Sequence, residues 1–290
     1  MSTKSVVIFQ KTTVYLILGF FALLSILPFW LMLVNTTRTN NEINTGISLV
    51  PGTALVENVK TLILGRLNTQ TGLRVAGINV PRGFVNSFII SASATLLTAY
   101  FCSMTAFAFV AYSFRGKKIF FALILGIMMI PSTVSLIGIY KLVVTIGLLD
   151  TWWPLILPAM ANPFAVFFLR NYLRTALPFS LLEAARIDGA SEPRIFHSMV
   201  LPLAMPGIAT ISIFGFLGSW NSYLLPLTII NSEGLQTLPL LIQQLNTTTF
   251  NRDLGALYAG VGISIVPVMV AFALFSRHLV AGLASGSVKE

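Results

Sequence analysis

Long uncharged apolar runs are the feature that most restricts what this chain can fold into. Six such runs lie along its 290 residues, and the first covers positions 14–34. About 20 apolar residues in a helix are needed to cross the hydrocarbon core of a bilayer. Only helices and closed barrels satisfy their backbone polar groups there, and these runs lack the alternation of barrel strands. The sequence therefore predicts an all-α integral membrane protein.

Composition and the position of the runs support six transmembrane helices. Only 9% of the residues are charged, against roughly 25% in a soluble domain. The first run is too long for the apolar part of a secretory signal, so we expect it to be retained. The expected spans are 14–34, 86–111, 119–140 (around Pro131), 153–169, 205–229 and 254–275 (around Pro267).

The distribution of basic residues predicts the orientation. A formal charge of +9 does not indicate nucleic-acid binding here, because the basic residues are spread over loops and tails. The short second connection contains Arg115, Lys117 and Lys118, and its side of the membrane collects eleven basic residues against seven opposite. Five of those seven lie in one long loop, where charge has less weight. We therefore expect both termini to be cytoplasmic, in a multi-pass membrane protein.

The longest loop and a shorter one are expected outside the cell membrane. Residues 36–82 are polar with scattered Val and Leu, which suits either a small packed cap or a loosely ordered connector. Residues 231–253 are rich in Gln, Asn and Thr, and positions 235–245 predict a brief helix. The expected organisation is an N-terminal tail (1–12), the first span (13–35), the extracytoplasmic loop (36–82), a transmembrane core (83–280) and a C-terminal tail (281–290).

One polar segment interrupts the apolar sequence between the fourth and fifth runs. Residues 183–202 read EAARIDGASEPRIFHSMVLP and contain Glu183, Asp188 and Glu192, a third of the nine acidic residues. A polar segment between two membrane spans is placed to contact a soluble partner. By the charge argument it lies in the cytoplasm.

Helix signals divide this segment into two helices around a turn. Pro178 suits a helix start, and Ser180 followed by Glu183 fits a capping box. Gly189 stands where a left-handed residue would end the first helix. Ser191 is placed to cap the second. We expect a helix, a tight turn and a second helix that leads to the membrane.

The spacing in this segment resembles the EAA motif of bacterial ATP-binding-cassette importer permeases. In that family the last cytoplasmic loop has EAA, three residues, Gly, nine residues, Ile, one residue and Leu-Pro. The matching positions are Glu183, Ala184, Ala185, Gly189, Met199, Leu201 and Pro202. The one departure is Met199 in place of Ile, which conserves apolar volume.

Further motifs narrow the resemblance to carbohydrate-type permeases. Residues 188–191 read DGAS, Trp220-Asn221 is followed by Pro226-Leu227, and the tail GLASGSVK is similar to the GLTxGAVK ending of that group. The tail departs from that pattern at Ala284 and Ser287. The likeness covers nearly the whole chain and is greatest to six-span, maltose-type subunits. It implies the type I ABC importer permease fold, with a cytoplasmic coupling helix between spans four and five.

The resemblance implies a role for each motif residue. In the family this helix docks in a groove of an ATPase, and Glu183 would contact a basic residue there. Small side chains at Ala184 and Ala185 would allow close approach, Gly189 would form the turn, and Asp188 would brace it. The implied coupling set within the 170–204 loop is Glu183, Ala184, Ala185, Asp188, Gly189, Ala190, Ser191, Leu201 and Pro202. In the tail, Gly286, Ser287 and Lys289 would also reach the ATPases.

The resemblance also implies partners. They are a second, different permease, two copies of a cytoplasmic ABC ATPase and an extracytoplasmic solute-binding protein. No GxxxxGK[ST] phosphate loop, catalytic constellation or metal-ligand spacing occurs in this sequence. We therefore expect no cofactor and no enzymatic activity in this chain, with ATP and Mg²⁺ bound by the partner ATPase.

The substrate pathway is indicated only by polar residues within the spans. Trp220, Asn221 and Tyr223 cluster on the fifth expected span, and Ser132 lies on the third. Such residues line pathways in transporters, but polar side chains also join membrane helices to one another. Both interpretations stay open.

The expected function is import of a di- or oligosaccharide from the binding protein into the cytoplasm by alternating access. A permease for a non-sugar solute such as glycerol phosphate is the main alternative. Amino-acid or peptide permeases share the EAA spacing but not the Trp220 and tail features. An ion-coupled transporter would need intramembrane acids or paired broken helices, and the expected spans contain no Asp or Glu.

Overall fold

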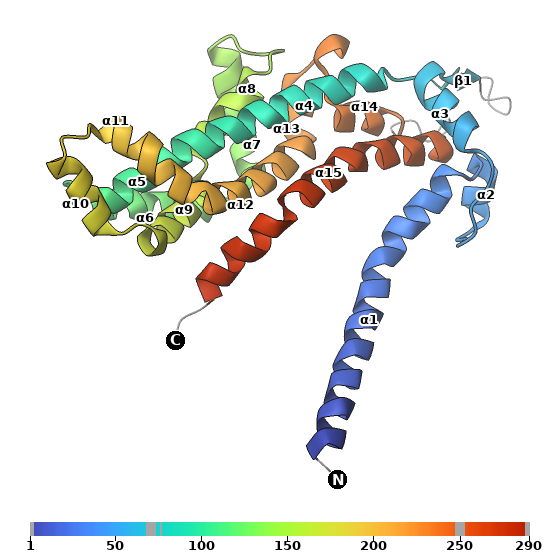
Figure 1. The fold of residues 1–290 in the computed structure, drawn as a ribbon. Helices are drawn as coiled ribbons and strands as arrows, with labels where there is room; N and C mark the ends of the chain where they lie inside the picture. The colour runs from blue at the N-terminus through green and yellow to red at the C-terminus, as the bar shows by residue number, and fades with distance from the viewer. Residues whose placement is uncertain (1–2, 68–73, 76, 247–252, 288–290) are drawn as a thin grey trace. The chain divides into compact units, whose positions relative to one another are not determined.

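The computed structural model describes residues 3–67, 74–75, 77–246 and 253–287. Within them, five helices are long and apolar enough to cross a bilayer, and a sixth span results if one bent helix pair is counted. The chain divides into two compact units, one of residues 1–80 with 241–265 and one of residues 81–240 with 266–290. Figure 1 shows the elements of both. The expected all-α membrane architecture is confirmed.

The first unit combines the first span with the long loop that follows it. Helix α1 (Thr3–Thr36) is continuous and apolar, and α2 (Asn40–Thr45) and α3 (Leu55–Leu64) follow. The small departure from an all-α fold is a ladder of two-residue strands, β1 (Arg66–Leu67) and β2 (Arg74–Val75), paired antiparallel.

The first described part of the long loop packs against the end of the first span. The buried side chain of Asn58 on α3 donates hydrogen bonds of 2.9 Å to the carbonyls of Thr36 and Arg38. These bonds tie α3 to the end of the first span. A capping box between Thr39 and Glu42 fixes the start of α2.

The second unit begins with one long helical span. It runs from Val80 to Ala111 through α4 (Val80–Leu97), the π-helical turn η1 (Thr98–Cys102) and α5 (Ser103–Ala111). The expected span 86–111 is therefore correct at its end and starts earlier.

The third expected span is wrong as a single helix. Helix α6 (Lys117–Met128) and α7 (Ser132–Thr145) meet at 105°. Pro131 lies between them, at the N-cap of α7. A proline has no N–H to continue the helix and disfavours helical geometry in the residue before it, so the chain breaks there.

The fourth span is longer than expected and interrupted. It runs from Trp153 to Ala176 through α8 (Trp153–Ile156), the 3-10 turn η2 (Leu157–Ala161) and α9 (Pro163–Ala176). Asn162 separates η2 from α9. Its side-chain oxygen accepts a 3.0 Å hydrogen bond from the backbone N–H of Ala165, which caps α9.

The continuous helix of the fifth expected span, 205–229, both starts and ends earlier than that range. The helix starts with α11 (Glu192–Ile195), continues through the π-helical turn η3 (Phe196–Val200) and ends with α12 (Leu201–Trp220). Short helix α13 (Leu224–Ile229) follows separately. Pro226 has no N–H for the carbonyl of Ser222, which explains why the helix cannot run through.

The remaining elements follow the sequence more closely. Residues of the expected 235–245 helix form α14 (Leu238–Gln244), after the short turn η4 (Glu233–Leu235). Helix α15 (Leu254–Ser287) contains the last span, with Pro267 inside it. Helix α10 (Phe179–Ile187) precedes α11.

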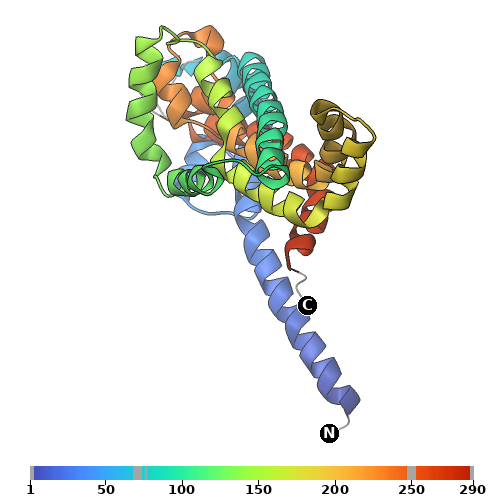
Figure 2. The same cartoon turned by 90° about the vertical axis from the view of Figure 1, so that its left-hand side faces the viewer.

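The core of the second unit lies among α5, α9, α10 and the α11–α12 helix. Figures 1 and 2 show α9, α10 and α11 folding back on one another beside α5. The apolar side chains buried at this junction include Phe107, Leu169, Leu173, Leu182, Ile195, Phe196 and Val200. This packing places α10 and its following turn at one end of the unit.

Candidate functional site

Helix α10 contains the EAA sequence, but its start differs from the expectation. The N-cap is Pro178, whose carbonyl accepts a 3.2 Å bond from the N–H of Leu181. Ser180 lies inside the first turn, so the expected capping box with Glu183 is wrong. Pro178 has the extended geometry that an N-cap requires, so the helix starts at Phe179, one residue before Ser180.

The turn after α10 has the expected form. Gly189 has φ +77°. Its N–H donates to the carbonyl of Arg186 at 3.1 Å, and the N–H of Ala190 donates to that of Ala185 at 2.9 Å. This bond pair is a Schellman motif, in which a left-handed residue closes the helix end. Asp188 is the C-cap residue and its side chain is exposed.

The two faces of α10 differ sharply in exposure. Leu182 and Ala185 point into the core, with exposed fractions of 1% and 8%. Ile187 on the other face is 86% exposed, beside exposed Glu183 and Ala184. The exposed surface of Glu183, Ala184, Ile187 and Asp188 is here called the docking face. Ala185 lies outside it and packs within the protein.

A polar network that the sequence does not reveal braces the turn. Arg186 Nε lies 2.8 Å from Glu192 Oε1, and its guanidinium carbon lies 5.6 Å from the Tyr112 ring centroid. The hydroxyl of Tyr112 donates to Glu192 Oε2, and Lys117 Nζ donates to the Tyr112 carbonyl at 2.7 Å. The network joins both sides of the turn to the end of α5.

The electrostatics of this network are mutually reinforcing. Burial first, and then the hydrogen bond to the Glu192 carboxylate, raises the pKa of Tyr112. The hydrogen bond to Glu192 raises the pKa of Arg186. No sequence signal pointed to Tyr112, because it lies on a different span and joins the turn only through the tertiary fold.

The other predicted coupling residues occupy varied positions. Ala190 is half-buried against the core, and Ser191 is the N-cap of α11 without a side-chain capping bond. Leu201 is half-buried and Pro202 exposed, both in the first turn of α12. In the tail, Gly286 and Ser287 end α15, but the side chain of Ser287 and all of Lys289 lie outside the described residues.

The predicted pathway residues do not line one common space. Trp220 is 1% exposed and packs between the rings of Phe84 and Phe216, at centroid distances of 5.4 and 5.8 Å. Asn221 is exposed and donates to the Leu217 carbonyl at 3.0 Å, and Tyr223 is the half-buried N-cap of α13. Ser132 begins α7, and its side chain is outside the described residues. Their role in transport stays a prediction.

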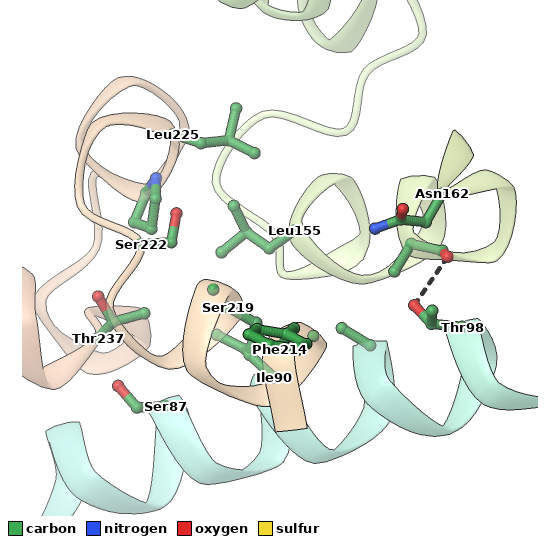
Figure 3. Close-up of a pocket in the computed structure, with 15 residues that line it drawn as sticks. Ser87, Ile90, Thr98, Leu155, Asn162, Phe214, Ser219, Ser222, Leu225 and Thr237 are labelled. Carbon is green, nitrogen blue, oxygen red and sulfur yellow. Dashed lines mark hydrogen bonds between the residues drawn. The ribbon is translucent and has the colours of Figure 1, made fainter. Parts of the chain in front are cut away.

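A cavity of about 230 Å³ lies between α4, the η2–α9 break and the α12–α13 break. Figure 3 shows side chains from all three regions around it. None of its lining residues is charged. The polar side chains that line it are Ser87, Thr98, Asn162, Ser219, Ser222 and Thr237.

The structure combines several membrane-crossing helices with a braced, polar helix and turn that lie between two of them. This combination defines a polytopic transport permease. The chain belongs to the family described as binding-protein-dependent transport system inner membrane component, whose sequence profile matches residues 100–285. That range contains the docking face, the network around the turn and four of the six polar cavity residues, all but Ser87 and Thr98.

Individual relatives agree with this family. The chain is 35% identical to the arabinooligosaccharides transport system permease protein AraQ of Halalkalibacterium halodurans, over 93% of this chain and 94% of that one. It is 31% identical to the sn-glycerol-3-phosphate transport system permease protein UgpE of Brucella abortus, over 88% and 89%.

A solved structure shares the fold. The chain superposes with a TM-score of 0.77 on a bacterial ABC transporter involved in import of the acidic polysaccharide alginate, at 20% identity. The match covers 96% of this chain and 98% of that one.

Proposed function

We propose that this chain is the permease subunit of an ATP-driven importer that moves a di- or oligosaccharide into the cytoplasm by alternating access. The solute would arrive on an extracytoplasmic binding protein. The observation that carries the coupling part of this proposal is the docking face of α10. It exposes an apolar side chain, Ile187, next to the carboxylate of Glu183, on a helix otherwise anchored in the core.

Anchoring makes α10 suitable for transmitting force. Its inner face packs through Leu182 among side chains of the fourth and fifth spans, and its C-terminal turn is braced to α5 through Tyr112. A push on the docking face would therefore reach three spans as a rigid-body movement. A partner that changes shape on binding ATP can shift the permease between two conformations only if it binds them with different affinities. A rigidly held docking helix allows this, because its movement is passed on to the spans it packs against.

We infer the remaining assembly from the same role. Two copies of a cytoplasmic ATPase would bind ATP and Mg²⁺ and dock on this α10 and on its counterpart in a second, different permease subunit. The docking face would then lie in the cytoplasm with both termini, and the segment 36–82 outside. This chain would bind no cofactor and catalyse no reaction itself.

The sugar assignment is supported by AraQ as a relative over almost the whole chain, together with the carbohydrate-type motifs at residues 188–191 and 220–227. UgpE, named for sn-glycerol-3-phosphate, is a slightly more distant relative. The test is uptake by proteoliposomes that contain the complete complex and its binding protein, with arabinotriose, trehalose and sn-glycerol-3-phosphate as probes. ATP-dependent uptake of a sugar is expected. Uptake of glycerol phosphate alone would overturn the sugar assignment.

A further inference from the structure

The cavity in the second unit lies where two spans lose their helical backbone. The fourth span breaks at Asn162, between η2 and α9, and the fifth breaks after Trp220, before α13. Both breaks line the cavity through Asn162 and Ser222. Non-helical backbone at membrane depth is tolerated only inside protein or beside a polar cavity. Two breaks at one cavity indicate a built site.

The polar groups around the cavity have unused hydrogen-bonding capacity. Thr237 is 4% exposed, and its hydroxyl has no hydrogen-bond partner in the described part of the chain. Leaving such a buried group unsatisfied is costly unless something else binds it. Thr237 therefore points to an occupant that the protein alone does not supply.

Three further side chains offer donors from other directions. The oxygen of Asn162 is used to cap α9, which leaves its NH₂ group for the cavity. Ser87 accepts a 2.8 Å bond from the Leu238 N–H, so its own hydroxyl proton is available. Ser222 has no side-chain hydrogen bond among the described residues. Figure 3 shows Asn162 and Ser222 on opposite sides of the space.

The chemistry of the lining selects a neutral ligand. Hydroxyl and amide groups both donate and accept, as the hydroxyls of a sugar do, and no lining side chain carries a charge. The negative charge of a phosphate ester would have no cationic side chain to balance it here, and burying such a charge in a poorly hydrated site is strongly unfavourable. Ile90, Leu155, Phe214 and Leu225 supply apolar surface for the C–H face of a ring.

The size of the cavity limits the ligand to a small unit. Its volume of about 230 Å³ is below the roughly 300–1,000 Å³ of pockets for drug-sized ligands. A cavity of this volume fits one ring of an oligosaccharide better than the whole oligosaccharide.

We propose that this cavity is a subsite within this subunit for one neutral, polyhydroxylated ring of the transported sugar. It deepens the proposed function and rests on it. Asn162, Ser222 and Thr237 bind hydroxyls of that ring, and the absence of a basic lining residue excludes phosphate esters.

The first test uses substitutions that remove a hydroxyl and keep the shape. Thr237→Val and Ser222→Ala in the full complex are expected to raise the KM for sugar uptake about 3- to 10-fold each, the loss of roughly one neutral hydrogen bond. The matched control is Thr145→Val, an exposed threonine of α7 outside the cavity, and it should leave KM unchanged. An unchanged KM in both cavity variants, with uptake intact, overturns the subsite.

The second test does not depend on transport rates. The chain has a single cysteine, Cys102, and it is fully buried. Ser222→Cys in the assembled complex should react with a small neutral thiol reagent, and the transported sugar should protect it while sn-glycerol-3-phosphate should not. Absence of labelling, or labelling that the sugar leaves unchanged, contradicts the proposal. If the wild-type complex imports no sugar at all, the proposed function itself fails, which is a different result.

Discussion

Arg186 and Glu192 pair across the turn at Gly189, with Arg186 Nε 2.8 Å from Glu192 Oε1. The pair links the last turn of α10 to the first turn of the fifth span, and Tyr112 joins it from the end of the second span. The docking helix is thus held to the transmembrane helices by side chains as well as by the connecting backbone. This brace would keep α10 from swinging freely when its partner moves.

Arg186→Gln should affect coupling more than stability. Both side chains are partly exposed, and such pairs contribute only about 0.2–1 kcal/mol to the free energy of unfolding. We expect a small drop in the melting temperature but a clear loss of sugar-stimulated ATPase activity in the complex. Arg194→Gln, an exposed arginine without an ion pair in the described chain, is the control. Equal behaviour of the two variants would contradict a bracing role.

Gly189→Val should disrupt the turn, whereas Gly189→Asn should preserve it. No atom lies within 4 Å of a Cβ added at Gly189, so space is not the constraint. Its φ of +77° costs a β-branched residue about 1–2 kcal/mol or more, and asparagine tolerates this geometry. We expect the valine variant to lose ATPase co-purification and the asparagine variant to retain most of it. Loss in both would show that glycine serves another purpose.

Ile187 and Leu182 offer a comparison of the two faces of one helix. Ile187→Ser, at 86% exposure, should change the free energy of unfolding by less than about 0.5 kcal/mol yet weaken ATPase binding. Leu182→Ala, at 1% exposure, should cost about 2–5 kcal/mol through the cavity it leaves. Thermal unfolding and co-purification separate the effects. Full ATPase binding by Ile187→Ser would remove this side chain from the docking face.

Asp150 should make the stability of the second unit depend on pH. Its carboxylate accepts hydrogen bonds from the Ser232 hydroxyl and from the N–H groups of Ser232 and Asn231, and these bonds lower its pKa below the ordinary 3.8. A lowered folded-state pKa stabilises the protein above pH 3.8, and that contribution disappears as the pH falls through the folded value. Asp150→Asn should flatten this acid-side dependence of the melting temperature. An unchanged profile would contradict the role of the carboxylate.

The sequence predicted the membrane class and the turn at Gly189, because apolar length and a left-handed glycine are local signals. The break at Asn162 was missed although Asn162 followed by Pro163 is a local signal for a helix start. The π-helical turns η1 and η3 were not predicted, since nothing in the local pattern distinguishes them from regular helix. The buried state of Ala185 and the contact of Tyr112 with Glu192 depend on which helices pack together. Trp220 looked like a pathway residue because it is aromatic and near polar neighbours, but its burial is fixed by Phe84 and Phe216 on two helices.

We propose that the exposed face of α10 couples this permease to an ATPase. The most direct test is the amount of ATPase that co-purifies with Glu183→Lys, measured together with ATP-dependent uptake. Glu233→Lys, the same charge change at an exposed acid of η4, is the control for folding and net charge. We expect at least a 10-fold loss of ATPase binding, about 1.4 kcal/mol of binding free energy, for Glu183→Lys alone. Wild-type binding and uptake in Glu183→Lys would contradict it.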